Sequence, residues 1–285
     1  MIAQNFEYSA PASLQEALAL LAGDDVKVLA GGMSLIPVLK LRLAAPGQLV
    51  DLGRIPELNY IREDGGALRI GAMTTHFQVE SSPLVRSKCP LLAEAASNIG
   101  DIQVRNMGTI GGSVAHADPA ADYPASLLAL EAKVSLASAK SKRELPVADF
   151  FVDTFTTALD PGEIVQEVSV PVEDQTVGTS YQKMLQPASG FAIVGVAARL
   201  RKAGGKVAMA RVGVTGLSGK PYRAIGVEKA LEGTTATAAD LPKAAALVAE
   251  GVDANSDLHA SAEFRKHLAR VYALRALTVA WSRTA

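Results

Sequence analysis

Apolar and polar residues alternate first with a helical period and then as short apolar runs. In residues 13–23 the apolar positions recur every three or four residues, which predicts an amphipathic helix. The continuous apolar run at 26–30 predicts a buried strand. Another helix is expected after it, capped by Ser34, and another strand at 49–52. Residues 1–55 are therefore expected to form a small α/β unit.

Residues 56–177 show short strands separated by helices. The Asp-Gly-Gly turn at 64–66 joins two alternating segments and predicts a hairpin. Helices are expected at 90–100 and from Pro119 onward, with Asp118 as the N-terminal cap of the latter. Further strands are expected at 133–138, 143–147 and 163–170. This unit is therefore predicted to be a mixed or antiparallel sheet that carries helices.

Residues 178–285 place strands before helices. Two long apolar segments flank the turn at 203–205, and three helical segments follow them. This order is typical of an α+β layer, in which helices cover one face of a sheet. The whole chain is thus predicted to be α+β, with mixed α/β character and three successive units.

Composition narrows the classes of function. The 285 residues are 49% hydrophobic and 20% charged, with a formal net charge of -1, so neither a nucleic-acid footprint nor a basic membrane patch is indicated. A single cysteine, Cys89, cannot supply a disulfide, a thiolate zinc site or an iron–sulfur cluster. The four histidines lack ligand spacing, so no metal site is expected. With neither an export signal nor a membrane span in the pattern, we expect a cytoplasmic protein.

Two glycine-rich loops carry the strongest chemical signal. Glycine lets backbone approach a ligand closely, and consecutive free N–H groups form a concave site for an oxyanion. A tight turn is the simpler interpretation of either glycine pair alone, because neither has the spacing of a P-loop or a dinucleotide turn. Together they predict a diphosphate clamp, formed by Ala30, Gly31, Gly32, Met33 and Ser34 on one side and by Thr109, Ile110, Gly111, Gly112 and Ser113 on the other.

The two aspartates after the second loop have different expected roles. Asp122 is close enough in sequence to reach a ribose diol, for which a carboxylate is a natural acceptor, whereas Asp118 is better explained as a helix cap. The sequence has no G-x-S-x-G nucleophile elbow and no evident serine, histidine and carboxylate set, so hydrolysis has no support. No catalytic residue is assigned in this chain.

Three motifs taken together resemble a known family. AGGMSLIPVLKLRLA at 30–44, IGAMTT at 70–75 and RNMGTIGGSVAHADPAAD at 105–122 are similar to the FAD-binding medium subunit of the molybdenum hydroxylases, as in bacterial carbon monoxide dehydrogenase and the flavin domain of xanthine dehydrogenase. The resemblance continues through PGEIV at 161–165 and through a tyrosine-x-lysine pattern that starts at residue 181. It thus runs nearly end to end.

The resemblance implies a two-part FAD-binding region of the vanillyl-alcohol-oxidase-like type and a smaller C-terminal sheet-and-helix domain. The glycine loops would hold the diphosphate of FAD, and Asp122 would contact its ribose or adenosine. Ile164 or Val165 would touch the flavin ring, and Lys183 would lie near the polar edge of the ring. Phe191 would occupy the place where many relatives have a tyrosine.

The sequence departs from the family pattern at two places. Many relatives have a histidine where this chain has Met33, which removes a polar side chain from the first loop. Many also have a basic run before the segment that contains Phe191, whereas residues 184–192 read MLQPASGFA here. The surroundings of the flavin are therefore expected to differ from those in many relatives.

The resemblance also implies a function and a set of partners. The chain would be the FAD-binding electron-transfer subunit of a molybdenum-containing hydroxylase or dehydrogenase. It would receive electrons from a small subunit with [2Fe-2S] clusters and pass them to an external acceptor. A large partner would hold the molybdenum cofactor, in a dimer of heterotrimers. Two alternatives stay open, namely a stand-alone FAD-dependent oxidoreductase and an assembly subunit without a cofactor.

Overall fold

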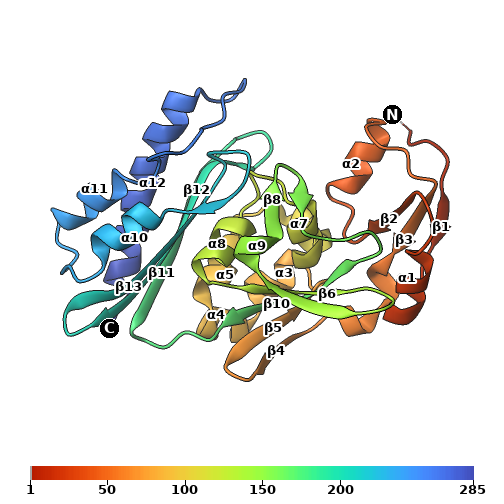
Figure 1. Ribbon diagram of the computed structural model, residues 1–285, viewed down its shortest axis with the longest axis horizontal. Helices are drawn as coiled ribbons and strands as arrows, with labels where there is room; N and C mark the ends of the chain where they lie inside the picture. The colour runs from red at the N-terminus through yellow and green to blue at the C-terminus, as the bar shows by residue number, and fades with distance from the viewer. Residues whose placement is uncertain (1) are drawn as a thin grey trace.

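The computed structural model describes residues 2–285 and arranges them in three units, each built on its own sheet. Figure 1 shows these units in a row, with the N-terminal unit at one end and the C-terminal unit at the other. Each unit has a cluster of buried apolar side chains, and the clusters of the first two units adjoin at Ala137 and Ile164.

The first unit has a parallel three-stranded sheet in the order β1-β3-β2. The hydroxyl of Ser13 caps the first helix by accepting a hydrogen bond from the N–H of Glu16 at 3.2 Å. The expected cap at Ser34 is wrong, because its backbone is already helical and its side chain makes no capping hydrogen bond. The elements are β1 (Glu7–Ser9), α1 (Leu14–Leu20), β2 (Val26–Leu29), α2 (Leu35–Lys40), β3 (Gln48–Asp51), η1 (Leu52–Arg54) and η2 (Pro56–Leu58).

The main sheet of the second unit has five antiparallel strands in the order β4-β5-β10-β6-β7, and β8 and β9 form a separate antiparallel pair. The predicted hairpin is confirmed, with Gly65 and Gly66 at φ +59° and +77° between its strands. Its strands are β4 (Ile61–Asp64), β5 (Ala67–Gly71), β6 (Lys133–Ala137), β7 (Lys142–Pro146), β8 (Phe151–Asp153), β9 (Thr156–Thr157) and β10 (Ile164–Pro171). Its helices are α3 (His76–Ser81), α4 (Pro83–Lys88), α5 (Pro90–Ser97), α6 (Ile102–Met107), α7 (Ile110–His116), α8 (Tyr123–Ala129) and α9 (Val147–Phe150).

The helix expected from Pro119 begins four residues later. Helix α8 starts at Tyr123 and has Pro124 in its first turn, the position that proline favours. Pro119 instead lies in a turn, where the carboxylate of Asp118 accepts a hydrogen bond from the N–H of Ala120 at 2.8 Å. The predicted helix cap at Asp118 is therefore wrong, because this side chain closes a local turn.

The third unit is an antiparallel sheet in the order β11-β12-β13-β14. Helices α10, α11 and α12 cover one face of it (Figure 1), while α8 of the second unit packs closely against β13. The expected order of strands before helices is confirmed. The elements are β11 (Val177–Leu185), β12 (Ala192–Ala203), β13 (Lys206–Thr215), β14 (Tyr222–Arg223), α10 (Ile225–Leu231), α11 (Asp240–Ala245) and α12 (Ala262–Ser282).

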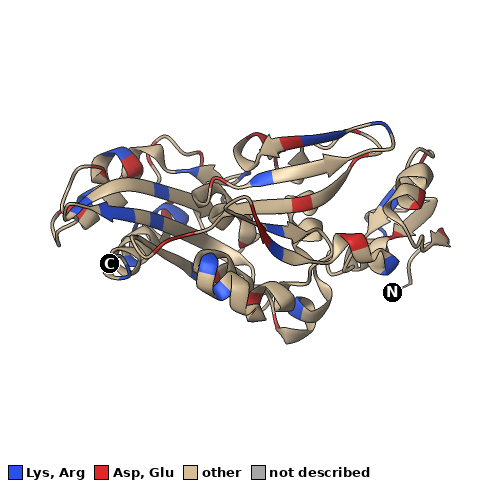
Figure 2. Ribbon diagram, turned by 90° about the horizontal axis from the view of Figure 1, so that it is seen from below, with Lys and Arg blue, Asp and Glu red and all other residues tan. Residues whose placement is uncertain are grey.

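Acidic and basic residues are interspersed over all three units (Figure 2), and several of them form ion pairs between units. Glu131, just after α8, is surrounded by Arg199, Arg211 and Arg223 of the third unit. Burial alone would raise the pKa of Glu131, but the three guanidinium groups outweigh it and lower that pKa. These pairs help to fix the third sheet against the second unit. Within residues 2–285, no helix is long and apolar enough to cross a membrane.

Candidate functional site

The second glycine pair lies inside a helix and not in a turn. Gly111 and Gly112 belong to α7, whose N-terminal cap is Thr109. The hydroxyl of Thr109 accepts a hydrogen bond from the N–H of Gly112 at 3.1 Å. A Cβ on Gly111 would come within 2.7 Å of the Cα of Ala72, so only glycine lets α7 pack this closely against the end of β5.

The expected free N–H groups of the second loop are therefore mostly occupied. The N–H of Ile110 donates to the carbonyl of Thr74 at 3.0 Å, and the N–H of Gly111 donates to the carbonyl of Ala72 at 2.9 Å. Together with the cap, these bonds satisfy the first three donors of α7 within the protein. The second loop therefore allows the backbone to approach a ligand closely, but it leaves few N–H groups free to donate.

The donors are found in the first loop. Gly32 has φ +75°, a left-handed conformation that glycine adopts at little cost. Within residues 2–285, the N–H groups of Gly32, Met33 and Ser34 have no hydrogen-bond acceptor. Consecutive unpaired N–H groups after a left-handed residue are the arrangement that binds phosphate oxygens. Met33 has an exposed apolar side chain, so its backbone is the part that offers a polar contact.

The two loops are in direct contact. A Cβ on Gly31 would lie 2.6 Å from the carbonyl carbon of Met107 and 2.7 Å from the Cα of Gly108. Likewise, a Cβ on Gly112 would be 3.4 Å from the Cβ of Ala30. The structure therefore brings together the two segments that the sequence places about 80 residues apart. A diphosphate fits the donors and the cradle that they form.

One side of α7 stays accessible beside this contact. Gly112, Ser113 and His116 are half-buried, whereas Ile110, Gly111 and Val114 face the core. Burial lowers the pKa of His116, despite the opposing charge of Asp118. His116 is a site candidate that no motif in the sequence indicates, although its distance of four residues from Gly112 places both on one helical face.

Asp122 and Lys183 form a buried ion pair. The Nζ atom of Lys183 lies 2.8 and 2.9 Å from the two carboxylate oxygens, and the hydroxyl of Tyr181 donates to the same carboxylate at 2.6 Å. Burial raises the pKa of Asp122 to about 6, even though the lysine and the hydroxyl act in the opposite direction. Asp122 is 3% exposed. A ribose contact would require this pair to open, so that role stays a prediction which the geometry does not favour.

The predicted flavin-ring residues lie in two different surroundings. Ile164 and Val165 begin β10 with buried side chains in the apolar clusters, so only their backbone could face a ligand. Phe191 follows the turn between β11 and β12 and is 42% exposed. Beside it, Gly190 at φ +74° packs against Gly100, at the start of the segment that leads to α6. The ring contacts of these residues stay predictions.

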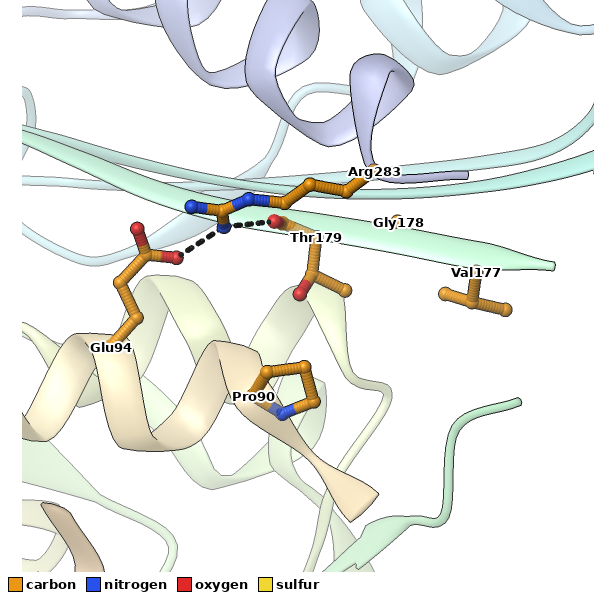
Figure 3. A pocket seen from close by; sticks show the side chains of 6 residues that line it. All are labelled: Pro90, Glu94, Val177, Gly178, Thr179 and Arg283. Carbon is orange, nitrogen blue, oxygen red and sulfur yellow. Dashed lines mark hydrogen bonds and ion pairs between the residues drawn. The ribbon is translucent and has the colours of Figure 1, made fainter. Parts of the chain in front are cut away.

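Two cavities lie beyond the glycine loops. One of about 270 Å³ is lined by the turn before β12 and by polar residues of the third unit, including Arg265 and Asp257. The other, of about 400 Å³, lies between α5 and β11 (Figure 3). There the guanidinium of Arg283 pairs with Glu94 at 3.1 Å and donates to the carbonyl of Thr179 at 2.7 Å. Residues 2–285 contain no cluster of three side chains that could hold a metal ion.

Comparison with known proteins agrees with this architecture. Residues 4–173 match the family described as the FAD binding domain in molybdopterin dehydrogenase, and residues 179–280 match the carbon monoxide dehydrogenase flavoprotein C-terminal domain. The expected FAD-binding region followed by a C-terminal sheet-and-helix domain is thereby confirmed. The glycine loops both fall in the first match.

Individual relatives cover the full length. The carbon monoxide dehydrogenase medium chain of Hydrogenophaga pseudoflava is 41% identical over all of both chains. The glyceraldehyde dehydrogenase medium chain of Sulfolobus acidocaldarius is 39% identical and covers 97% of this chain and 98% of its own. The solved structure of carbon monoxide dehydrogenase from H. pseudoflava has a TM-score of 0.97 at 42% identity and covers 100% of both chains. The solved structure of quinoline 2-oxidoreductase from Pseudomonas putida 86 has a TM-score of 0.94 at 34% identity and covers 99% of both chains. The chain therefore belongs to the FAD-binding medium subunits of the molybdenum hydroxylase family.

Proposed function

We propose that this chain carries electrons through FAD, from an iron–sulfur partner subunit to an external acceptor. The observation that carries the proposal is the contact between the two glycine loops, the first of which has three consecutive unpaired N–H groups. The match of residues 4–173 to an FAD binding domain supports FAD as the source of the diphosphate. When bound, the flavin supplies the redox chemistry, and the protein supplies binding, orientation and electrostatics.

Backbone N–H groups and one side-chain hydroxyl would bind the diphosphate. The backbone N–H groups of Gly32, Met33 and Ser34 would donate to the phosphate oxygens, and the hydroxyl of Ser113 is placed on the accessible face of α7 to add a donor. Because backbone groups supply the donors, the methionine that replaces the histidine of many relatives does not remove them. Gly31 keeps the first loop close enough to α7 for both to reach one ligand.

Partners are needed for the remaining chemistry. With one cysteine, the chain cannot ligate a [2Fe-2S] cluster, so the cluster thiolates must come from another chain. The relatives are named as medium chains or as subunits of dehydrogenase complexes. We infer a small iron–sulfur subunit and a large subunit with the molybdenum cofactor, assembled as a dimer of heterotrimers in the cytoplasm. Substrate oxidation would take place on the large subunit.

Rapid mixing of separated subunits tests the direction of electron flow. The chain is loaded with FAD and mixed anaerobically with the reduced iron–sulfur subunit, while the flavin absorbance is followed. We expect the flavin absorbance to bleach, and then to return when a quinone, a nicotinamide nucleotide or oxygen is added as the acceptor. A flavin that stays oxidised with the partner present, yet is reduced by a small-molecule donor with the chain alone, would instead favour a stand-alone oxidoreductase.

A second measurement addresses the alternative of an assembly subunit. A variant with bulky residues at Gly111 and Gly112 is co-expressed with both partners, and the flavin and metal contents of the complex are measured. We expect a complex, if it forms, to lack flavin and to reduce no acceptor at the flavin. An unmodified chain that assembles without any flavin would overturn the proposal.

A further inference from the structure

A buried polar cluster joins three elements next to the FAD-binding region. Tyr181 and Lys183 come from β11, Asp122 begins α8, and the carbonyl of Asn98 ends α5. The ammonium of Lys183 donates to that carbonyl at 2.8 Å and to Asp122, whose carboxylate also accepts from Tyr181. All three side chains are almost wholly buried. Tyr181 and Lys183 can meet one carboxylate because residues two apart face the same side of a strand.

A glycine leaves the space that this cluster needs. Gly195 on β12 is the register partner of Lys183, and the phenol of Tyr181 crosses above it. A Cβ on Gly195 would overlap the hydroxyl of Tyr181 and would lie 3.0 Å from its Cζ and 2.8 Å from a methyl of Thr215. Any larger residue would thus push the hydroxyl away from Asp122. The glycine therefore has a role in the position of this hydroxyl.

The cluster is connected both to the turn that carries Phe191 and to the segment 117–122, which links α7 to α8. Strand β11 ends two residues after Lys183, and the turn that follows packs at Gly190 against Gly100. The segment between α7 and α8 is hydrogen-bonded to the start of β12, because the N–H of Ala192 donates to the carbonyl of Ala120 at 3.1 Å. A shift of the cluster would therefore move the turn relative to the glycine helix.

We propose that Tyr181 is a positioning residue of the FAD site. Its hydroxyl, for which Gly195 leaves room, holds the carboxylate of Asp122. Asp122 then fixes the ammonium of Lys183, which keeps the end of β11 and the turn before Phe191 in place beside α7. The inference rests on FAD binding by this chain and not on the route of the electrons.

The protonation state of Asp122 gives this role a pH dependence. Burial raises its pKa to about 6, and the groups that face it are Lys183, Tyr181, Tyr123 and the more distant Asp118. Loss of the Tyr181 hydrogen bond would raise the pKa of Asp122 further, because that bond stabilises the ionised form. Protonation would then weaken the pair with Lys183 near neutral pH. At higher pH the carboxylate would ionise again and the pair would return.

The test uses the full chain and compares two tyrosine variants. Tyr181→Phe removes the hydroxyl on Asp122, whereas Tyr222→Phe removes a hydroxyl outside the cluster, which donates to the carbonyl of Val248 at 2.8 Å. The dissociation constant of FAD is measured from the quenching of flavin fluorescence between pH 6 and 8. For Tyr181→Phe we expect it to rise about tenfold at pH 7, as for one lost hydrogen bond to a charged group, with a larger rise at pH 6 and partial recovery at pH 8. For Tyr222→Phe we expect less than about a twofold change at every pH, because its hydroxyl does not contact the cluster.

Gly195→Ala provides a second variant, because it displaces the hydroxyl without removing it. We expect the same pH-dependent loss of FAD affinity as for Tyr181→Phe, with circular dichroism checking that both variants are folded. If both bind FAD as tightly as the unmodified chain, or lose affinity equally at all pH values, Tyr181 contributes packing alone and the proposal is overturned. Since the assay needs no partner subunit, its result is independent of the proposed electron transfer.

Discussion

Replacement of Gly31 by alanine tests the contact on which the proposed FAD site depends. Gly31 does not have a left-handed backbone, so alanine is compatible with its conformation and the added methyl group is the only change. That methyl would lie 2.6 Å from the carbonyl carbon of Met107 and 2.7 Å from the Cα of Gly108. Both neighbours are backbone atoms, which cannot move aside as the end of a flexible side chain can.

The size of the effect follows from these distances. Non-bonded carbon atoms rest at roughly 3.5 Å, so the first loop must move away from the end of α6 by about 1 Å. Overpacking of this kind costs about 1–3 kcal/mol. The shift would also carry the N–H groups of Gly32, Met33 and Ser34 away from the proposed position of the phosphates. Loss of even one hydrogen bond to a charged group corresponds to about a tenfold to hundredfold rise in the dissociation constant of FAD.

The assay is fluorescence titration of the purified chain with FAD, together with thermal unfolding without FAD. Gly226→Ala is the matched control, since Gly226 lies in α10 and its added methyl would meet the Cβ of Leu247 at an ordinary 3.6 Å. Alanine in a helix is better than glycine by up to about 1 kcal/mol, so we expect this control to bind FAD normally and to melt at the same or a higher temperature. A folded Gly31→Ala chain that binds FAD within twofold of the unmodified chain would refute the reasoning.

Three further variants probe the surrounding structure. Thr109→Ala removes the cap of α7 and should lower the free energy of unfolding by about 1 kcal/mol, as measured with denaturant, while Thr109→Ser should restore it. Gly213→Ala would place a methyl group 2.8 Å from the carbonyl carbon of Ala125, so the melting temperature measured by calorimetry should fall. An unchanged melting temperature would contradict the tight packing of β13 on α8. Burial, and to a lesser degree the charge of Arg105, lowers the pKa of His76 to about 4 in the folded chain. At a pH between this value and the ordinary pKa of histidine, the unfolded chain therefore binds a proton that the folded chain does not bind. The contribution of neutral His76 to the free energy of unfolding is fully present above pH 6.5, and about 3 kcal/mol of it is lost as the pH falls to 4. His76→Gln should therefore flatten the dependence of unfolding free energy on pH in this window, and equal slopes for the two chains would exclude this role.

Local patterns in the sequence were sufficient for most elements of the fold. The hairpin at 64–66 and the cap at Ser13 depend on residues within a few positions of each other, so their signals were complete. The order and spacing of the glycine motifs also identified the family and its cofactor. The same local reasoning failed at Asp118, because Pro124 competes with Pro119 for the start of the helix.

Only the tertiary structure decided what the site residues do. Whether the N–H of Gly111 is free depends on Ala72, and the four helices α3 to α6 separate these two residues along the chain. Asp122 was expected to face a ribose, but its charge is met by Lys183, 61 residues later, at the point where β11 meets the residue before α8. Such contacts depend on how sheets and helices pack, and that packing has no periodicity in the sequence. The sequence therefore determined which residues are candidates for the site, whereas the structure determined which of their polar groups are left for a ligand.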